Sequence, residues 1–167
     1  MADFKKFDEY KLFIEDTARL SERRFTISNS YLAANFSLIL GIIGLMITSS
    51  LKDGVFANSP LTIAILPLII AGIVVCILWH RQLATYKTFI DFRMKQLEEM
   101  EKSKELEGCH RMYNLEADRF YRKAPEGLKI GYTRIEIQLP WLFLILYAIF
   151  GIGLLGVLGI RLLLWVA

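Results

Sequence analysis

The sequence has little of the chemistry that enzymes use. It lacks a phosphate-binding loop, a dinucleotide fingerprint, an HExxH pair and a nucleophile elbow. It has two cysteines, Cys76 in an apolar run and Cys109 in a polar one, so neither a disulfide between them nor a metal site is indicated. The net charge of +3 is too small to indicate nucleic-acid binding. We therefore expect no enzyme activity, no cofactor, no metal and no nucleic-acid partner.

Charge is missing from three long runs, residues 31–48, 61–79 and 141–160. The chain is 54% hydrophobic with a mean hydropathy of +0.41, which is high for a soluble domain. At about 1.5 Å per residue each run is about 27–30 Å long, close to the hydrocarbon thickness of a bilayer. The first run is not a cleaved signal peptide, because 30 charged and amphipathic residues precede it. The sequence predicts an all-α integral membrane protein with three transmembrane helices.

The charged segments divide the chain into six parts. We expect an amphipathic helix over 1–27, a first span over 28–49, an external loop over 50–60, a second span over 61–79, a polar helical region over 80–138 and a third span over 139–165. Thr133 and Glu136 have the spacing of a capping box, so a helix is expected to begin near Thr133. Pro140 then either kinks that helix or begins a new one.

Two amphipathic stripes lie outside the predicted spans. The first has residues that recur every three or four positions, as in an amphipathic helix: Phe4, Phe7, Tyr10, Ile14, Thr17 and Leu20. The second has Leu83, Tyr86, Ile90, Leu97 and Met100, beside a charged face that includes Glu98, Glu99 and Glu101 and that we expect to be solvated. Helices of this kind bury their apolar stripes on each other. We therefore predict a helical layer outside the membrane.

Lysine and arginine counts predict the orientation of the chain. The N-terminal segment has six, the 50–60 connection has one and the 80–138 region has twelve. The positive-inside rule then places the N-terminus and the helical layer in the cytoplasm and the C-terminus outside. Trp79, Trp141 and Tyr31 fall at the inner boundary, as in an aromatic belt.

The first span has a stripe of small residues. Ala33, Ser37, Gly41 and Gly44 recur at spacings of four, four and three, and Thr48 follows four residues later. Small residues let another helix approach closely, so the stripe packs either between subunits or against the protein's own spans. Asn35 points roughly away from it, and a buried amide in lipid needs a partner. This side chain either bonds a neighbouring helix or lines a polar cavity.

Three stretches carry a family resemblance: SERRFTISNSYLAAN at 21–35, WHRQLATYKTFIDFRMKQLEEME at 79–101 and YTRIEIQLPWLF at 132–143. In order and spacing they resemble the RipA-like family of small bacterial inner-membrane proteins, described as octameric. The resemblance implies a bacterial cytoplasmic membrane and a homo-oligomer. The residues that carry it are Arg23, Arg24, Asn35, Trp79, Arg81, Tyr86, Thr133, Glu136, Pro140 and Trp141.

Two functions agree with these features. The first is an oligomeric channel or pore-like assembly, favoured by the small-residue stripe, Asn35 and the implied octamer. The second is a membrane scaffold or anchor whose cytoplasmic helices bind a protein partner, favoured by the long helical region and by spans without charge. In both cases the expected partners are other copies of the chain and membrane lipids.

Overall fold

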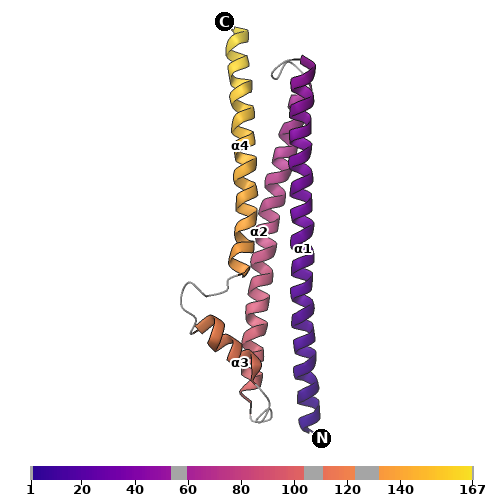
Figure 1. Cartoon of the computed structure of the whole chain (residues 1–167), viewed down its shortest axis with the longest axis vertical. Helices are drawn as coiled ribbons and strands as arrows, with labels where there is room; N and C mark the ends of the chain where they lie inside the picture. The colour runs from indigo at the N-terminus through magenta and orange to yellow at the C-terminus, as the bar shows by residue number, and fades with distance from the viewer. Residues whose placement is uncertain (1, 54–59, 104–110, 123–131, 167) are drawn as a thin grey trace. The chain divides into compact units, whose positions relative to one another are not determined.

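The computed structural model describes residues 2–53, 60–103, 111–122 and 132–166. In these ranges the chain forms helices and no strand (Figure 1): α1 (Ala2–Asp53), α2 (Pro60–Glu101), α3 (Met112–Glu116), the π-helix η2 (Ala117–Arg122) and α4 (Tyr132–Val166). Helices α1, α2 and α4 each contain a segment that is long and apolar enough to cross a membrane. The predicted all-α fold with three candidate membrane spans is confirmed.

The long helices continue past the ends of the apolar runs. Helix α1 has 52 residues, and its sequence has no proline and no glycine before Gly41. Helix α2 continues through Pro67 for 42 residues, and α4 continues through Pro140 for 35. Each proline removes one backbone donor but does not end the helix. Because α4 begins at Tyr132, the alternative that Pro140 begins a new helix is wrong.

The chain divides into two compact units. Unit 1 consists of Met1–Ile27 and Gln82–Glu136, and unit 2 consists of Ser28–Arg81 and Ile137–Ala167. Most of the charged residues belong to unit 1, whereas the three apolar runs belong to unit 2. The division therefore separates a polar helical layer from a candidate membrane unit.

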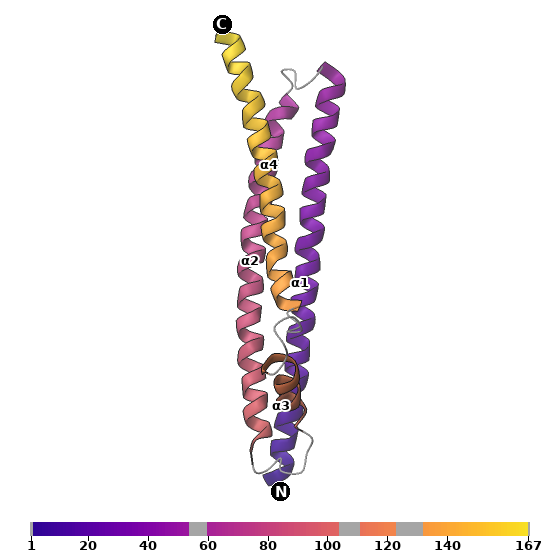
Figure 2. The ribbon, with the colours of Figure 1, turned by 60° about the vertical axis from the view of Figure 1, so that its left-hand side comes forward.

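In unit 2, segments of α1, α2 and α4 lie side by side (Figures 1 and 2). The buried side chains include Ile42, Ile65, Ile69, Tyr147 and Leu154. In the most apolar 18-residue stretches of α1, α2 and α4, only 17, 28 and 17%, respectively, is buried within the chain. Most of the apolar surface of these segments therefore needs lipid or another subunit to cover it.

In unit 1, α1 and α2 are antiparallel. Tyr10 is bonded to Glu101, whereas Asp16 is paired with Arg93, so residue numbers rise along one helix as they fall along the other. Thr17 on α1 and Leu83 and Leu97 on α2 are buried. The two amphipathic stripes thus lie against each other, as predicted, although Phe7 is half exposed.

Candidate functional site

A buried polar cluster connects the three helices of unit 2. The Asn35 side chain is fully buried, and its Nδ2 donates to the carbonyl of Tyr31 at 2.8 Å. Its Oδ1 accepts from Cys76 Sγ at 3.2 Å and from Tyr147 Oη at 3.2 Å. Since Asn35, Cys76 and Tyr147 come from α1, α2 and α4, the amide is satisfied within one chain. Of the two alternatives for Asn35, the described geometry is the bond to neighbouring helices.

Gly72 provides the space for this cluster. A Cβ atom added to Gly72 would lie 2.2 Å from Cζ of the Tyr147 ring, closer than any van der Waals contact allows. Tyr147 is fully buried, so its ring has little room to move. The glycine is therefore needed for the Tyr147 hydroxyl to reach Asn35.

Two signals for this cluster are present in the sequence. Tyr147 has the only hydroxyl group in the run 141–160, and Gly72 is the only glycine in the run 61–79. A single hydroxyl group in an apolar span needs a partner, and a single glycine often marks a close approach. Nothing local to either residue says that the partner of Tyr147 is Asn35, which is 112 residues away.

An aromatic group surrounds one end of unit 2. Trp79 is fully buried and stacks on Tyr31, with ring centroids 6.1 Å apart and planes 5° apart. Phe143 contacts Trp79 at 6.0 Å, and Trp141 meets the ring of His80 edge-on at 5.5 Å. Offset and edge-on arrangements of this kind add to the stability that burial provides. Trp79 and Tyr31 therefore pack within the chain, whereas Trp141 is half exposed.

Glu101 is the most buried charge in the described part of unit 1, with 2% of its surface exposed. Oε1 accepts from Tyr10 Oη and from the Tyr113 backbone N–H, each at 2.9 Å. Oε2 accepts from the Asn114 backbone N–H at 2.9 Å and from Asn114 Nδ2 at 2.7 Å. The expectation that Glu101 lies on a solvated face is wrong, because its carboxylate joins α1, α2 and α3.

Glu101 supplies the N-terminal cap that α3 lacks in its own sequence. The residue before α3 is Arg111, whose side chain caps no N–H. The second and third N–H groups of a helix are the ones that a cap normally satisfies, and here these are Tyr113 and Asn114. Burial raises the pKa of Glu101, but the hydrogen bonds from Tyr113, Asn114 and Tyr10 outweigh it and hold this pKa below its ordinary value.

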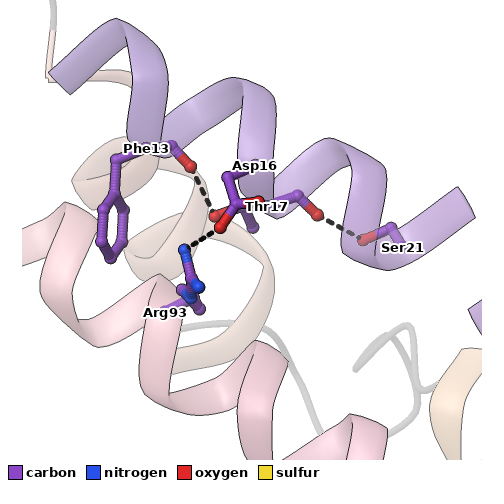
Figure 3. A network of polar contacts seen from close by, with 5 residues as sticks. All are labelled: Phe13, Asp16, Thr17, Ser21 and Arg93. Atoms are coloured by element: carbon purple, nitrogen blue, oxygen red, sulfur yellow. Dashed lines mark hydrogen bonds and ion pairs between the residues drawn. The ribbon is translucent and has the colours of Figure 1, made fainter. Parts of the chain in front are cut away.

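Arg93 joins the two long helices of unit 1 through a second polar contact (Figure 3). It pairs with Asp16, and its guanidinium lies 4.8 Å from the centre of the Phe13 ring. The Arg93 and Asp16 side chains are 31 and 54% exposed, so solvent screens the pair. Arg93 interrupts the apolar stripe of α2 and nevertheless faces α1.

The pair between Arg93 and Asp16 is expected to contribute little stability. Asp16→Asn should change the free energy of unfolding by less than about 1 kcal/mol, as is usual for exposed ion pairs. Arg93→Ala should cost more, because it also removes the contact with the Phe13 ring. Thermal unfolding of the purified protein measures both variants. A larger loss for Asp16→Asn than for Arg93→Ala would contradict this assignment.

The remaining residues that carry the family resemblance have mixed environments. Arg24 Nη2 lies 3.5 Å from Glu136 Oε2, an ion pair rather than a hydrogen bond, whereas Arg23 is exposed. Pro140 is fully buried, Tyr86 is half-buried and Arg81 is exposed. The side chain of Thr133 lies outside the described residues.

The small-residue stripe of α1 is exposed along its length. Ala33, Ser37, Gly41 and Gly44 are all exposed, although a Cβ added to Gly41 would touch Leu68 Cδ1 at 4.0 Å. A Cβ added to Gly44 would have no neighbour within 4 Å. Within the described chain the stripe therefore has room for a further helix. Its role as a helix-packing surface stays a prediction.

Comparison with known proteins identifies the family. The sequence pattern of the octameric membrane protein family (8xMP) matches residues 7–156. The chain belongs to this family. No curated protein and no solved structure matches it.

Membership of 8xMP gives the exposed surfaces a context. The family is one of octameric membrane proteins, so self-association is a property of the chain. Some of the exposed apolar surface of each 8xMP subunit must then face another subunit, while the rest faces lipid. Among the described residues, no group of histidine, cysteine, aspartate and glutamate has the arrangement of a metal site.

Proposed function

We propose that the octamer is a membrane-anchored scaffold whose helical layer outside the bilayer binds a protein partner. The observation that carries the proposal is that the buried polar groups of unit 2 point towards the inside of the chain. Asn35, Cys76 and Tyr147 bond to one another inside the chain. Over 31–48, 64–79 and 141–160 the exposed side chains carry no charge, and Ser37 and Thr48 have the only exposed hydroxyl groups.

The geometry of an eight-membered ring supports a scaffold over a water-filled pore. Eight helices about 9 Å apart have their axes about 12 Å from the centre, which leaves an opening about 13 Å wide. An apolar lining offers water no hydrogen-bond partners, which favours lipid over water in such an opening. Whichever face of the described segments 31–48, 64–79 and 141–160 lines the centre, it offers almost no polar group to hold water.

Unit 1 supplies the surface for a partner. Exposed charges of both signs lie along α2, at Lys87, Asp91, Lys95 and Glu99. Eight copies of such a surface in one ring increase the apparent affinity for a partner with several binding sites. In this proposal the spans hold the helical layers of the eight subunits together at the membrane. Lipid only surrounds the spans.

Conductance in planar bilayers tests the proposal. We expect the purified octamer to produce no steady ion current, with a known channel protein as the positive control. A photo-reactive amino acid in place of Lys95 should then capture a partner protein in cells. The double variant Lys87→Glu with Asp91→Lys should no longer bind this partner, although it still forms the octamer. A reproducible current that requires the octamer would overturn the scaffold proposal.

A second candidate is a pore lined by the α1 stripe. The observation that favours it is the exposure of Ser37 and Thr48 on the same helix as Gly41 and Gly44. If this face lines a conducting centre, Ser37→Glu should change the selectivity between cations and anions. Asn35→Leu is a poorer probe than Ser37→Glu, because Asn35 is buried and its loss would alter the packing of the three helices.

The cellular setting is part of the same proposal. The charge bias supports a cytoplasmic N-terminus and an external C-terminus. The resemblance described above supports a bacterial inner membrane and the narrower RipA-like relationship. Reporter fusions to the two ends of the chain, one active only in the cytoplasm and one only outside it, test the orientation. Activity of the cytoplasmic reporter at the C-terminus would refute it.

A further inference from the structure

Unit 1 exposes two large aromatic side chains of α2 outside the apolar runs. Phe89 and Phe92 are 55 and 56% exposed. Exposed charges at Lys87, Asp91 and Lys95 lie on the same segment of α2, so the bilayer interior cannot cover this segment. Neighbouring exposed aromatic residues on a polar helix usually mark a contact with another protein.

These two residues belong to a second stripe on α2, which we call the outer face: Gln82, Thr85, Phe89, Phe92 and Gln96. The spacings are three, four, three and four, as in a helix that packs against a parallel or antiparallel neighbour. None of the five carries a charge. Four of them precede by one residue a member of the stripe that packs on α1, and Phe92 precedes Arg93, which also faces α1. Helix α2 therefore has two adjacent packing faces.

The outer face lies on the side of α2 opposite to α3. Helix α3 contacts α2 through the Glu98 carbonyl and the Glu101 carboxylate. Phe89 and Phe92 precede these two residues by nine positions, which is two and a half turns and places them about 180° around the helix. Helix α3 therefore leaves the outer face uncovered.

Helix α1 has a matching surface on the other side of the pair. Ala18, Ser21 and Phe25, which we call the α1 flank, form an uncharged strip, with Phe25 61% exposed. The Ser21 hydroxyl donates to the Thr17 carbonyl at 3.2 Å, so it can face an apolar side chain without losing its partner. Because Ala18 and Ser21 are small, a phenylalanine ring can approach α1 closely at these positions.

The outer face and the α1 flank point in opposite directions. Ala18 and Ser21 each follow by one residue a member of the α1 stripe, Thr17 and Leu20, whereas the residues of the outer face each precede a position on the α1-facing side of α2. On two antiparallel helices, residues that follow the facing positions of one helix and residues that precede the facing positions of the other lie on opposite sides of the pair. The pairing of Asp16 with Arg93 also places Ala18 near the level of Phe92, and Phe25 near that of Thr85.

Two opposite surfaces at one level are what a ring of identical subunits requires. Chains inserted in one orientation can be related only by an axis normal to the membrane, because a two-fold axis in the membrane plane would invert half of them. Eight such chains form a cyclic ring in which one face of each subunit meets a different face of the next. The two surfaces have this relationship.

We infer that unit 1 forms a subunit contact of the octamer, in which the outer face of one chain packs on the α1 flank of the next. Phe92 lies over Ala18, and Phe89 lies over Ser21. The partner is thus a second copy of this chain. The contact is required in either candidate function, and it does not depend on whether the octamer conducts ions or binds a further protein.

Cysteine cross-linking in the full-length octamer tests the contact. In a Cys109→Ser background, with the buried Cys76 retained, Ala18→Cys and Phe92→Cys in one chain should give a ladder of cross-linked species up to the octamer. Either substitution alone should give monomers. Chains with Ala18→Cys mixed with chains with Phe92→Cys should give dimers and nothing larger. The matched control is Arg19→Cys with Lys95→Cys, two exposed positions off these faces, which should give no ladder.

The other outcomes overturn the inference. Dimers from Phe92→Cys alone would mean that the outer face meets itself, and the absence of a ladder from an intact octamer would mean that something else covers it. A second measurement uses Phe89→Glu, which should lower the octamer fraction in mild detergent about tenfold, as loss of a central aromatic contact does. Lys87→Glu, a charge change off the outer face, should leave that fraction unchanged.

Discussion

Gly72→Val is expected to destabilise unit 2 by about 3 kcal/mol. The first added carbon would lie 2.2 Å from Tyr147 Cζ, so the ring must move away. Forcing a larger side chain into a packed interior costs about 1–3 kcal/mol. Displacing the ring also separates its hydroxyl from Asn35, and interhelical hydrogen bonds in membranes are worth about 0.6–2 kcal/mol.

Thermal unfolding of the octamer in one detergent measures this effect. Gly156→Val on α4 is the matched control, because a Cβ at Gly156 would have no atom within 4 Å. Both variants change glycine to valine within a helix, so the difference between them reports the contact with Tyr147. Equal stability of the two variants would show that the Tyr147 ring does not occupy the described position.

Glu101→Ala is expected to release α3 from the pair of long helices. The change removes the acceptor of four hydrogen bonds and leaves the Tyr113 and Asn114 backbone N–H groups without a cap. Hydrogen bonds to a charged group are worth about 1.5–3 kcal/mol each when one partner is lost. Amide hydrogen exchange over residues 111–117 should accelerate by about 30-fold or more. The matched control is Glu99→Ala, an exposed carboxylate on the same helix, which should leave this exchange unchanged.

The stabilisation by Glu101 should depend on pH in a defined direction. Its folded pKa lies below the ordinary value, so the charged carboxylate stabilises the fold above the unfolded pKa of about 4.3. This contribution falls as the pH drops from there through the folded pKa. The stability difference between the parent protein and Glu101→Gln should therefore be constant near neutrality and shrink in acid. A difference that grows as the pH falls would refute the assignment.

The two units give different roles to their buried polar groups. In unit 2 the Asn35 amide is shared among three helices, which determines how the spans pack when lipid provides no hydrophobic difference between inside and outside. In unit 1 the Glu101 carboxylate attaches a five-residue helix that is too short to be stable alone. Because both groups form their contacts within one chain, the contacts between subunits must be formed by the exposed surfaces.

The sequence by itself determined that the chain is helical and has three candidate membrane spans. The free energy of moving a segment into lipid depends on its own residues, so an uncharged run of 18 to 20 residues is sufficient. The sequence also indicated that the stripes with Thr17 and Leu97 lie against each other, because helical periodicity is local.

Only the tertiary structure decided where the polar groups go. In the sequence Glu101 lies in the same charged segment as the exposed Glu99, and only the position of α3 shows that the Glu101 carboxylate is a cap. Likewise, nothing near Asn35 in the sequence identifies Tyr147 as its partner. The small-residue stripe and the two phenylalanines of the outer face are exposed because the other sides of α1 and α2 form the contacts within the chain. Periodicity shows which residues share a helix face, whereas the choice of the face that packs depends on contacts between distant segments.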